Sequence, residues 1–347
     1  MEKYQVLEIS APNEIKWTTW DKRDLLSDEV LVKISHFAIC TSEQGIYTGA
    51  RKAKYPVYMG HEVVGEIAEI GSNVPGDFQL GDYVAVSPMG ICGLCYNCRK
   101  GLDNACLNRP QLVREGRPPG TGGFAEYMII PAYQAFKLSK NVDLPSASLA
   151  EPVACCICSI DKASINYGDN VLVVGAGIMG LIHVALAKLK GAHVIVSEPN
   201  AERRKFALNY GADEAIDTEK DFAEEVNRVT GGLGLQSVFL CGGPTGIIPG
   251  IIEACSIGAT IVIYTSYQGN NKPGVELDMN RIHYKEVNLV GTISRRRDDF
   301  QRAAALIDKN EIDLKTLVEK IYTKDQVEEA FAHSIKPDTF RILVRMD

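Results

Sequence analysis

Long hydrophobic runs and long basic runs are both missing from this chain of 347 residues. No apolar segment approaches the length of about 18 residues that a membrane-spanning helix needs, and residues 1–7 resemble neither a signal peptide nor a transit peptide. We therefore expect a cytoplasmic protein with no membrane partner. The net charge is −7, and no Lys/Arg tract is long enough to follow a phosphate backbone, so we expect no nucleic-acid partner.

Internal repeats and low-complexity segments are absent as well. The chain is long enough for two domains with separate hydrophobic cores. Cysteine, in contrast, is plentiful: the chain has ten, and a reducing compartment favours metal ligands and buried thiols over disulfides. Cys155, Cys156 and Cys158 stand at spacings that spread them around a helix, so we predict that these three are buried in the core.

Four of the cysteines lie close together in the pattern CxxCxxC followed by a fourth. Thiolates at this spacing can surround a tetrahedral Zn²⁺ ion, and the glycines among them let the backbone curl around the metal. Disulfides are the alternative, but they suit a short secreted chain better than this one. We predict a closed, structural zinc site with all four positions filled by Cys92, Cys95, Cys98 and Cys106.

The rhythm of the apolar segments changes near residue 170. Before this point, short β segments separated by Gly, Pro and Asn indicate a compact β-rich domain, with strands at residues 29–34, 62–70, 82–86 and 124–130. After it, continuous Val/Ile/Leu runs alternate with helical segments, which indicates a parallel sheet covered by helices. We predict its strands at residues 171–174, 193–196, 237–240, 260–264 and 287–291, followed by a helix at about 297–309 and a βαβ-like tail.

A glycine-rich motif follows the first of these parallel strands and opens a helical segment. In this context Gly175 occupies the tight turn, Gly177 lets a pyrophosphate approach the backbone, and Gly180 lets helix and strand pack closely. Glu198 ends the next strand, where a carboxylate binds the adenosine ribose and repels a 2′-phosphate. NAD is therefore favoured over NADP, unless nearby arginines at 203 and 204 accept a phosphate. The predicted cofactor site comprises Gly175, Gly177, Ile178, Met179, Gly180, Glu198 and Arg203.

A second group of residues has metal-binding chemistry: Cys40, His61, Glu62 and Glu151. Thiolate, imidazole and carboxylate are all zinc ligands, and three protein ligands leave a fourth position for water or substrate. Residue type alone leaves this open, because a cysteine at a strand end is often a core residue and a His-Glu pair is often an exposed turn. Two interpretations therefore stay open: these residues share one metal ion, or they are separate core and surface residues.

Five motifs in this order resemble the zinc-dependent medium-chain dehydrogenases, the family of alcohol, sorbitol and threonine dehydrogenases. The resemblance covers the whole chain, and its motifs are Gly60-His61-Glu62, the cysteine cluster at 92–106, GlyGlyPheAlaGluTyr at 122–127, Glu151-Pro152, and Gly175 to Gly180. It implies an α/β protein of two domains. One is a GroES-like, β-rich catalytic domain at residues 1–150 that is completed by residues 293–347. The other is a Rossmann domain with a doubly wound parallel sheet at residues 151–292.

The resemblance also implies that Cys40, His61 and Glu62 hold a catalytic zinc. Glu151 either joins these ligands or hydrogen-bonds the water on the metal. An acid at position 151, where classical alcohol dehydrogenases carry a cysteine ligand, points to the polyol branch. The loop at residues 117–120, Arg-Pro-Pro-Gly, is similar to a proline-containing loop of sorbitol dehydrogenases and points the same way.

Shortly after Cys40, Ser42 and Glu43 keep chemical groups of the family pattern, whereas Gly45 departs from it. Ser42 keeps the hydroxyl with which the family takes the substrate proton. Glu43 keeps an acid that could orient His61, although its side chain is one methylene longer than the usual aspartate. Gly45 lies where many relatives carry a histidine that passes the proton to solvent, so water, the Glu151 carboxylate or the cofactor ribose would take over that step.

We therefore predict an enzyme with two zinc ions per chain that transfers hydride between NAD and a secondary alcohol of a polyol, sugar or sugar acid. Two alternatives stay open: oxidation of a β-hydroxy amino acid, as in threonine dehydrogenases, and a non-catalytic nucleotide-binding relative. Arg114 and Arg117 either overhang the substrate pocket or face solvent, and residues 295–297 either touch cofactor or substrate or begin a helix that faces water. Since family members form dimers and tetramers, a homodimer or homotetramer is implied.

Overall fold

The computed structural model describes residues 2–109, 120–217, 222–267 and 274–346. Arg114, Arg117 and the rest of the proline-containing loop up to residue 119 lie outside these ranges. The chain divides into two compact units, Met1–Ala154 together with Arg295–Asp347, and Cys155–Ser294. The domain boundaries that we predicted from the sequence lie after residues 150 and 292. No helix in the described ranges combines the length and the apolar character that crossing a membrane requires.

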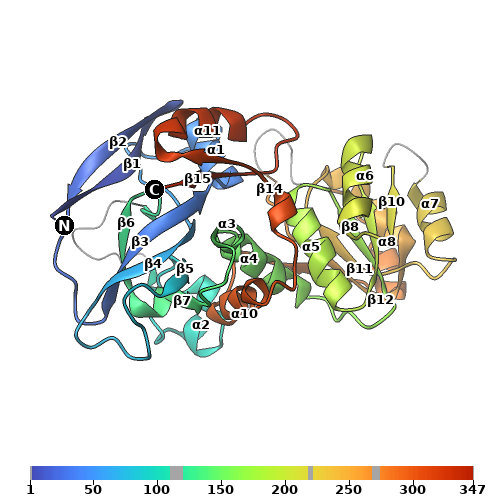
Figure 1. Ribbon diagram of the computed structural model, residues 1–347. Coiled ribbons are helices and arrows are strands. Elements are labelled where there is room, and N and C mark those ends of the chain that lie inside the picture. The colour runs from blue at the N-terminus through green and yellow to red at the C-terminus, as the bar shows by residue number, and fades with distance from the viewer. Residues whose placement is uncertain (1, 110–119, 218–221, 268–273, 347) are drawn as a thin grey trace. The chain divides into compact units, whose positions relative to one another are not determined.

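The first unit is built around a seven-stranded sheet. Its central strand β3 (Glu29–Ala38) pairs antiparallel with β4 (Glu62–Ile70), β6 (Tyr127–Pro131) and β15 (Arg341–Arg345). Figure 1 shows β15, the last of these strands in the sequence, in red beside the blue strand β3. The four strands predicted here are confirmed. The sequence reading missed β1 and β2, which form a separate ribbon, and it also missed the short strand β7. The other strands of this unit are β1 (Lys3–Ala11), β2 (Glu14–Asp21), β5 (Tyr83–Val86), β7 (Ala135–Leu138) and β14 (Val318–Thr323).

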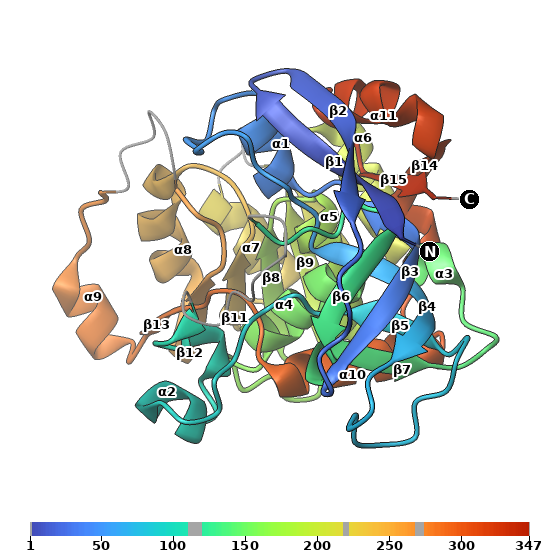
Figure 2. The same cartoon turned by 90° about the vertical axis from the view of Figure 1, so that its left-hand side faces the viewer.

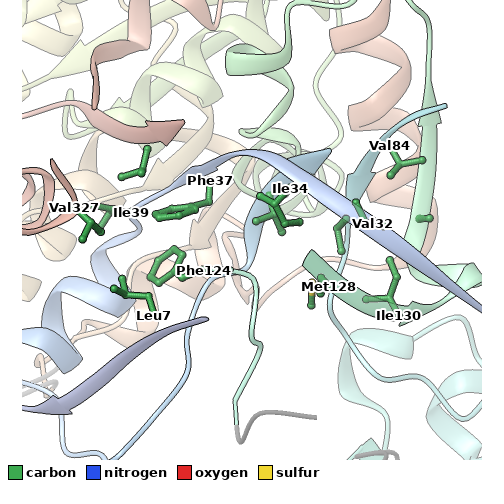
Figure 3. Close-up of a cluster of buried hydrophobic side chains, with 14 of the residues drawn as sticks. Leu7, Val32, Ile34, Phe37, Ile39, Val84, Phe124, Met128, Ile130 and Val327 are labelled. Atoms are coloured by element: carbon green, nitrogen blue, oxygen red, sulfur yellow. The ribbon is translucent and has the colours of Figure 1, made fainter. Parts of the chain in front are cut away.

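The core of the first unit contains residues from both of its chain segments. Phe37 of β3 and Phe124 are fully buried with ring centroids 4.5 Å apart, and Figure 3 shows the two rings next to each other. Phe331, from the later segment, packs edge-on against Phe124 at 5.8 Å. Each buried aromatic ring of this kind contributes about 1.5–3 kcal/mol, so the late segment is part of this core and not an appendage.

The helices of the first unit are short apart from α10. Strands β14 and β15 are parallel with α11 between them in sequence, so the predicted βαβ-like tail is confirmed. The helix predicted at 297–309 is confirmed as α10. Figure 2 shows α2 at the tip of a loop that extends away from β5 and β7. The helices are α1 (Thr41–Tyr47), α2 (Tyr96–Arg99), α3 (Leu144–Ala147), α10 (Arg297–Asp308) and α11 (Val327–Ser334).

The second unit is a six-stranded parallel sheet with the strand order β10-β9-β8-β11-β12-β13. This order reverses between β8 and β11, and in open α/β sheets ligands bind at such a switch point, outside the carboxyl ends of the strands. All five predicted strands are confirmed. The strands are β8 (Asn170–Val174), β9 (His193–Ser197), β10 (Glu214–Ile216), β11 (Leu235–Leu240), β12 (Cys255–Ile263) and β13 (Asn288–Gly291).

The helices of this unit alternate with its strands. The connection β8-α5-β9 is a βαβ unit of the kind that the sequence pattern predicted, and β9-α6-β10 is a second one, although the short strand β10 was not predicted. Helix α4 (Ala150–Ile160) belongs to both units, and its cysteines Cys155, Cys156 and Cys158 are buried, as predicted. The other helices are α5 (Ile178–Leu189), α6 (Ala201–Tyr210), α7 (Phe222–Val229), α8 (Ile248–Ala254) and α9 (Met279–Tyr284).

Candidate metal and cofactor sites

Three of the predicted catalytic-zinc ligands come together where β3 ends and β4 begins. Cys40 lies just after β3, while His61 and Glu62 lie at the start of β4. The two strands are antiparallel, with Ala38 opposite Glu62, which brings the cysteine to the His-Glu pair. The ligand atoms of Cys40, His61 and Glu62 all lie within 4.8 Å of one another. One thiol, one imidazole and one carboxylate therefore face a common point.

The environment of Glu62 fits a metal ion. Its side chain is fully buried, and neither carboxylate oxygen accepts a hydrogen bond of acceptable geometry from the described residues. Arg341 Nη2 lies 3.1 Å from Glu62 Oε1, which compensates charge without satisfying both oxygens. Leaving buried carboxylate oxygens without partners is costly, and a divalent cation would satisfy them. With a thiolate and an imidazole beside them, the donor set fits Zn²⁺.

Glu43 holds His61 in a fixed orientation. The carboxylate is buried, and its Oε1 lies 2.5 Å from His61 Nδ1, which leaves Nε2 of the imidazole to bind a metal. The other oxygen, Oε2, accepts a hydrogen bond of 3.0 Å from Ser42 Oγ. Burial lowers the pKa of His61, but Glu43 and Cys40 outweigh this effect and raise it well above its usual value. The longer acidic side chain thus positions both the histidine and the serine hydroxyl.

Glu151 does not belong to the group formed by Cys40, His61 and Glu62. It lies in the first turn of α4, and its Oε1 is 2.7 Å from Arg295 Nη1. The two side chains are only 9% and 8% exposed, so this is a buried ion pair. Of the two roles that the resemblance left open for Glu151, hydrogen bonding to a water on the metal agrees with this placement better than direct ligation.

Arg341 is a site residue that the sequence reading missed. It is fully enclosed in β15, where it pairs with Glu62 and donates a hydrogen bond of 3.0 Å from Nη1 to the Ile39 carbonyl oxygen. Burial alone would lower the pKa of Arg341, but the surrounding carboxylates and Cys40 raise it. The guanidinium therefore stays charged beside Glu62. In the sequence, Arg341 is marked only by its place as a charged residue at the start of an apolar segment, which does not indicate a site residue.

The four cysteines of the predicted structural site form the second metal-binding group. Their sulfur atoms lie within 4.8 Å of one another, around the short helix α2. The backbone amides of Cys95 and Leu94 donate to Cys92 Sγ at 3.3 and 3.4 Å and lower the pKa of that thiol to about 6. This favours the thiolate, which is the form that binds zinc. We refer to residues 92–109 as the cysteine lobe.

The predicted cofactor residues lie at the carboxyl ends of β8 and β9. Gly175 has a left-handed backbone (φ 96°), and a Cβ on Gly180 would lie 1.9 Å from the Gly175 carbonyl oxygen, so the strand-to-helix turn needs both glycines. A Cβ on Gly177 would meet only open space, as expected where a phosphate approaches the backbone. Ile178 and Met179 form the first turn of α5.

Glu198 lies beside this turn. Its Oε2 accepts a hydrogen bond of 2.8 Å from the Ala176 amide, and its Oε1 accepts one of 3.0 Å from the Asn200 amide. Two backbone donors therefore fix the carboxylate next to the glycine-rich turn, where a cofactor ribose would meet it.

The two arginines that could accept a 2′-phosphate differ in their placement. Arg204 Nη1 donates to the carbonyl oxygens of Glu198 and Pro199 at 2.7 Å each, and its Nη2 lies 2.9 Å from Asp217 Oδ2. The Arg204 guanidinium is thus engaged by protein groups. Arg203 lies in the first turn of α6, where its amide donates to Asn200 Oδ1 at 3.2 Å.

Segments of both units match domains of known proteins, and full-length relatives are known. The alcohol dehydrogenase GroES-like domain matches residues 26–140, and the zinc-binding dehydrogenase domain matches residues 179–309. A sorbitol dehydrogenase from Halalkalibacterium halodurans is 33% identical over 89% of this chain and 88% of its own length. An L-threonine 3-dehydrogenase from Pyrococcus horikoshii is 34% identical over 87% of each chain. The crystal structure of an alcohol dehydrogenase from E. coli CFT073 with NADH has 26% identity and a TM-score of 0.88 over the whole of both chains. The chain therefore belongs to the zinc-dependent medium-chain dehydrogenase family, in its sorbitol dehydrogenase-like branch, and is an alcohol dehydrogenase.

Proposed function

We propose that this enzyme oxidises a secondary alcohol of a polyol, sugar or sugar acid to a ketone, with NAD as the hydride acceptor. The observation that carries the proposal is the group formed by Cys40, His61 and Glu62, with the hydroxyl of Ser42 held next to it. The similarity to a sorbitol dehydrogenase supports the polyol class.

In the first unit, different residues would bind the metal, accept the proton of the alcohol and hold a water molecule. Cys40, His61 and Glu62 would hold the zinc ion, which when bound lowers the pKa of an alcohol hydroxyl by on the order of eight or nine units. Ser42 Oγ donates its own hydrogen to Glu43, so its lone pairs remain available to accept the proton of the alcohol. The Glu151 carboxylate, fixed by Arg295, would bind a water molecule.

The second unit would bind the cofactor. The amides around Gly177 would contact the pyrophosphate, and Glu198 would accept hydrogen bonds from the adenosine ribose. NAD supplies the acceptor for the hydride that leaves the alcohol carbon.

A substrate screen tests this function. We expect NADH formation with at least one member of a panel of polyols, sugar acids and sugar phosphates. The same panel includes L-threonine, because the relative from Pyrococcus horikoshii and the Ser197-Glu198-Pro199 stretch favour a β-hydroxy amino acid as the second candidate substrate. Turnover of threonine alone would replace the polyol proposal. No turnover of any member by protein loaded with zinc and NAD would support a non-catalytic role.

Glu198 is expected to set the preference for NAD. In Glu198→Ala we expect KM for NAD to rise about tenfold and the ratio of kcat/KM for NAD over NADP to fall about 10- to 100-fold, because a charge-assisted ribose contact and a repulsive charge are both lost. The measurement is steady-state kinetics with each cofactor. Glu202→Ala, in the exposed first turn of α6, is the matched control and should leave the ratio unchanged. An unchanged ratio in Glu198→Ala would contradict this role.

We further propose that the enzyme is a homodimer joined along β13. This strand lies at the edge of the parallel sheet, where in the described part of the chain no strand pairs with its outer side. Such an edge presents backbone donors and acceptors that an antiparallel copy can satisfy. Leu289 on the strand is partly exposed, and Ile293 just after it is 75% exposed. A homotetramer is the alternative assembly.

The dimer can be tested with Ile293→Asp. A charge at an apolar interface position is expected to weaken association by about 30-fold or more, which would yield monomers at micromolar concentration. Light scattering coupled to size-exclusion chromatography measures the mass. Leu208→Asp on α6 provides the control for a charge placed at another exposed aliphatic residue. A wild-type monomer, or an Ile293→Asp variant of unchanged mass, would count against β13 as the interface.

The cytoplasm is the compartment we propose for this enzyme. All ten cysteines lie in the described ranges and none of them forms a disulfide, and eight of them are zinc-ligand candidates or buried on α4. Zinc thiolates and buried thiols of this number suit a reducing environment.

A further inference from the structure

The loop that follows helix α1 carries three cations among four residues. Arg51, Lys52 and Lys54 are all exposed, in a chain whose net charge is −7. Within the described ranges, no carboxylate oxygen lies within 4.0 Å of the charged nitrogens of these three side chains. Because α1 begins directly after Cys40, this uncompensated positive charge follows the first of the catalytic-zinc ligands by only about three helical turns of chain.

Gly45 fixes the place of Arg51 against α1. A glycine inside a helix costs roughly 1 kcal/mol relative to alanine, and Gly45 does not have a left-handed backbone that would require it. It provides space instead: a Cβ at position 45 would lie 3.3 Å from Arg51 Cβ, which is tighter than most such contacts. The Arg51 amide also donates a hydrogen bond of 2.8 Å to the Gly45 carbonyl oxygen. The base of the Arg51 side chain therefore rests on α1.

This position is one helical turn from the hydroxyl that we propose as the acceptor of the substrate proton. Ser42 and Gly45 are three residues apart on α1, so they share a face of the helix with about 5–6 Å between their Cβ positions. Arg51 Cβ is thus at most about 9 Å from Ser42 Cβ. An arginine side chain and a six-carbon substrate both have lengths of this order. A substrate whose hydroxyl group meets Ser42 can therefore present its far end to the Arg51 guanidinium.

The backbone that carries Arg51 is held at both ends of the loop. Where α1 ends, the Asn13 amide donates to the Tyr47 carbonyl oxygen at 2.6 Å. At the other end of the loop, Tyr55 Oη donates to the Ile46 carbonyl oxygen at 2.5 Å. A binding residue on a backbone that is fixed beforehand loses less conformational entropy when its ligand arrives.

The acid closest to this loop in the α1 sequence is already engaged. Glu43 is buried, with one carboxylate oxygen 2.5 Å from His61 Nδ1 and the other accepting the hydrogen bond of Ser42. It is therefore not a partner for Arg51. The guanidinium remains available for an anion that comes from outside the chain.

We propose that Arg51 binds an anionic group of the substrate, so that this enzyme oxidises a polyol that carries a carboxylate or a phosphate in preference to a neutral polyol. A guanidinium pairs with either anion through two parallel hydrogen bonds. Lys52 and Lys54 add to the positive potential that attracts the anion. The proposal rests on the dehydrogenase function proposed above and names the substrate class of that site.

Ligands that share one carbon chain test this class. Sorbitol, gluconate and sorbitol 6-phosphate differ in the group at one end, and equivalent triplets on the galactitol and mannitol chains cover other configurations of the hydroxyl groups. With enzyme loaded with zinc and NADH, calorimetry should find at least one anion that binds about tenfold or more tightly than its neutral counterpart. Comparison of the carboxylate with the phosphate of that triplet identifies which anionic group the site accepts.

The variant Arg51→Gln assigns this preference to one residue. Its affinity for the preferred anion should fall about 10- to 100-fold, while its affinity for the neutral polyol should change less than about twofold. Arg51→Lys should keep part of the affinity, because the charge stays and the two parallel hydrogen bonds are lost. The matched control is Lys52→Gln, which removes the same charge from the next residue and should cost less than about threefold. For a ligand that is turned over, the loss should appear in KM, with kcat within about threefold of the wild type.

Three results would overturn the role of Arg51. They are an absence of any anion that binds more tightly than its neutral counterpart, an equal loss for anion and neutral polyol in Arg51→Gln, and an equal loss of anion affinity in Arg51→Gln and Lys52→Gln. Because Arg51 is exposed, Arg51→Gln should keep the wild-type midpoint of thermal unfolding.

The two proposals fail in different ways. The calorimetric titrations need no turnover, so they decide the role of Arg51 even if no alcohol in the panel is oxidised. Turnover of neutral polyols alone would leave the proposed function intact and contradict the role of Arg51.

Discussion

Replacing Cys40 with serine is expected to reduce turnover by at least about 10³-fold while NADH binding stays within about twofold of the wild type. A serine hydroxyl is not ionised near neutral pH, so the donor set loses its thiolate and with it much of its hold on the zinc ion that lowers the pKa of the alcohol. Cofactor binding is retained because the glycine-rich turn and Glu198 belong to the other unit. Steady-state kinetics, metal analysis and NADH fluorescence titration provide the measurements.

A second variant at the same site has a different signature. Glu62→Ala should also abolish turnover, but it leaves Arg341 buried without its partner, and breaking a buried ion pair of this kind costs about 3–5 kcal/mol of stability. Cys40→Ser should cost much less. Cys255→Ala, at a buried thiol of the other unit, is the control and should retain full turnover. Undiminished turnover in a Cys40→Ser protein of measured zinc content would refute the assignment.

Replacing Cys98 with serine is expected to release the structural zinc and unfold the cysteine lobe. The lobe has almost no core of its own: Leu94, Tyr96 and Leu107 are 71%, 68% and 62% exposed, and α2 buries none of its residues. The metal is therefore its main source of stability, and in isolated zinc fingers such a metal contributes about 10–16 kcal/mol of apparent binding free energy. In this larger chain we expect the midpoint of thermal unfolding to fall by roughly 10 °C.

Three measurements define that outcome. Metal analysis should find one zinc per chain instead of two, calorimetry should report the lower midpoint, and limited proteolysis should cleave within residues 92–109. A zinc-free lobe that resists protease would show that other contacts hold it. Cys158→Ala should leave all three readouts unchanged.

The sequence was sufficient to predict the elements whose signals are local. The parallel strands read as continuous apolar runs because both faces are buried, and the glycine-rich turn and the cysteine lobe have motifs of fixed spacing. Strands β1 and β2 were missed because residues such as Glu14, Lys16 and Asp21 make the ribbon only half apolar. Grouping Cys40 with the His-Glu pair depended on the family resemblance, since the antiparallel register that joins them is not visible in the sequence.

The ion pairs of the first unit could not be predicted in the same way. Arg341 and Glu62 lie on neighbouring parts of one sheet but far apart in the chain, and Arg297 meets Asp103 across a similar sequence distance. A single charged residue in a sequence looks the same whether it is solvated or buried against an opposite charge. Only the packing of β15 shows that Arg341 is buried and that it lies against Glu62, and only the position of α10 shows that Arg297 meets Asp103. The same holds for the pairing of Arg295 with Glu151.

The pairing of β15 with β3 also has a consequence for how the protein is made. Cys40, His61 and Glu62 leave the ribosome early, whereas the counter-ion of Glu62 and the last strands of the same sheet are translated only after the entire second unit. At bacterial or eukaryotic elongation rates the interval is tens of seconds. During that time the nascent first unit exposes an open sheet edge and the Glu62 carboxylate with no arginine beside it. The second unit, which is contiguous in sequence, can fold first, so we expect chaperones to bind the N-terminal portion of nascent chains until residue 345 has emerged.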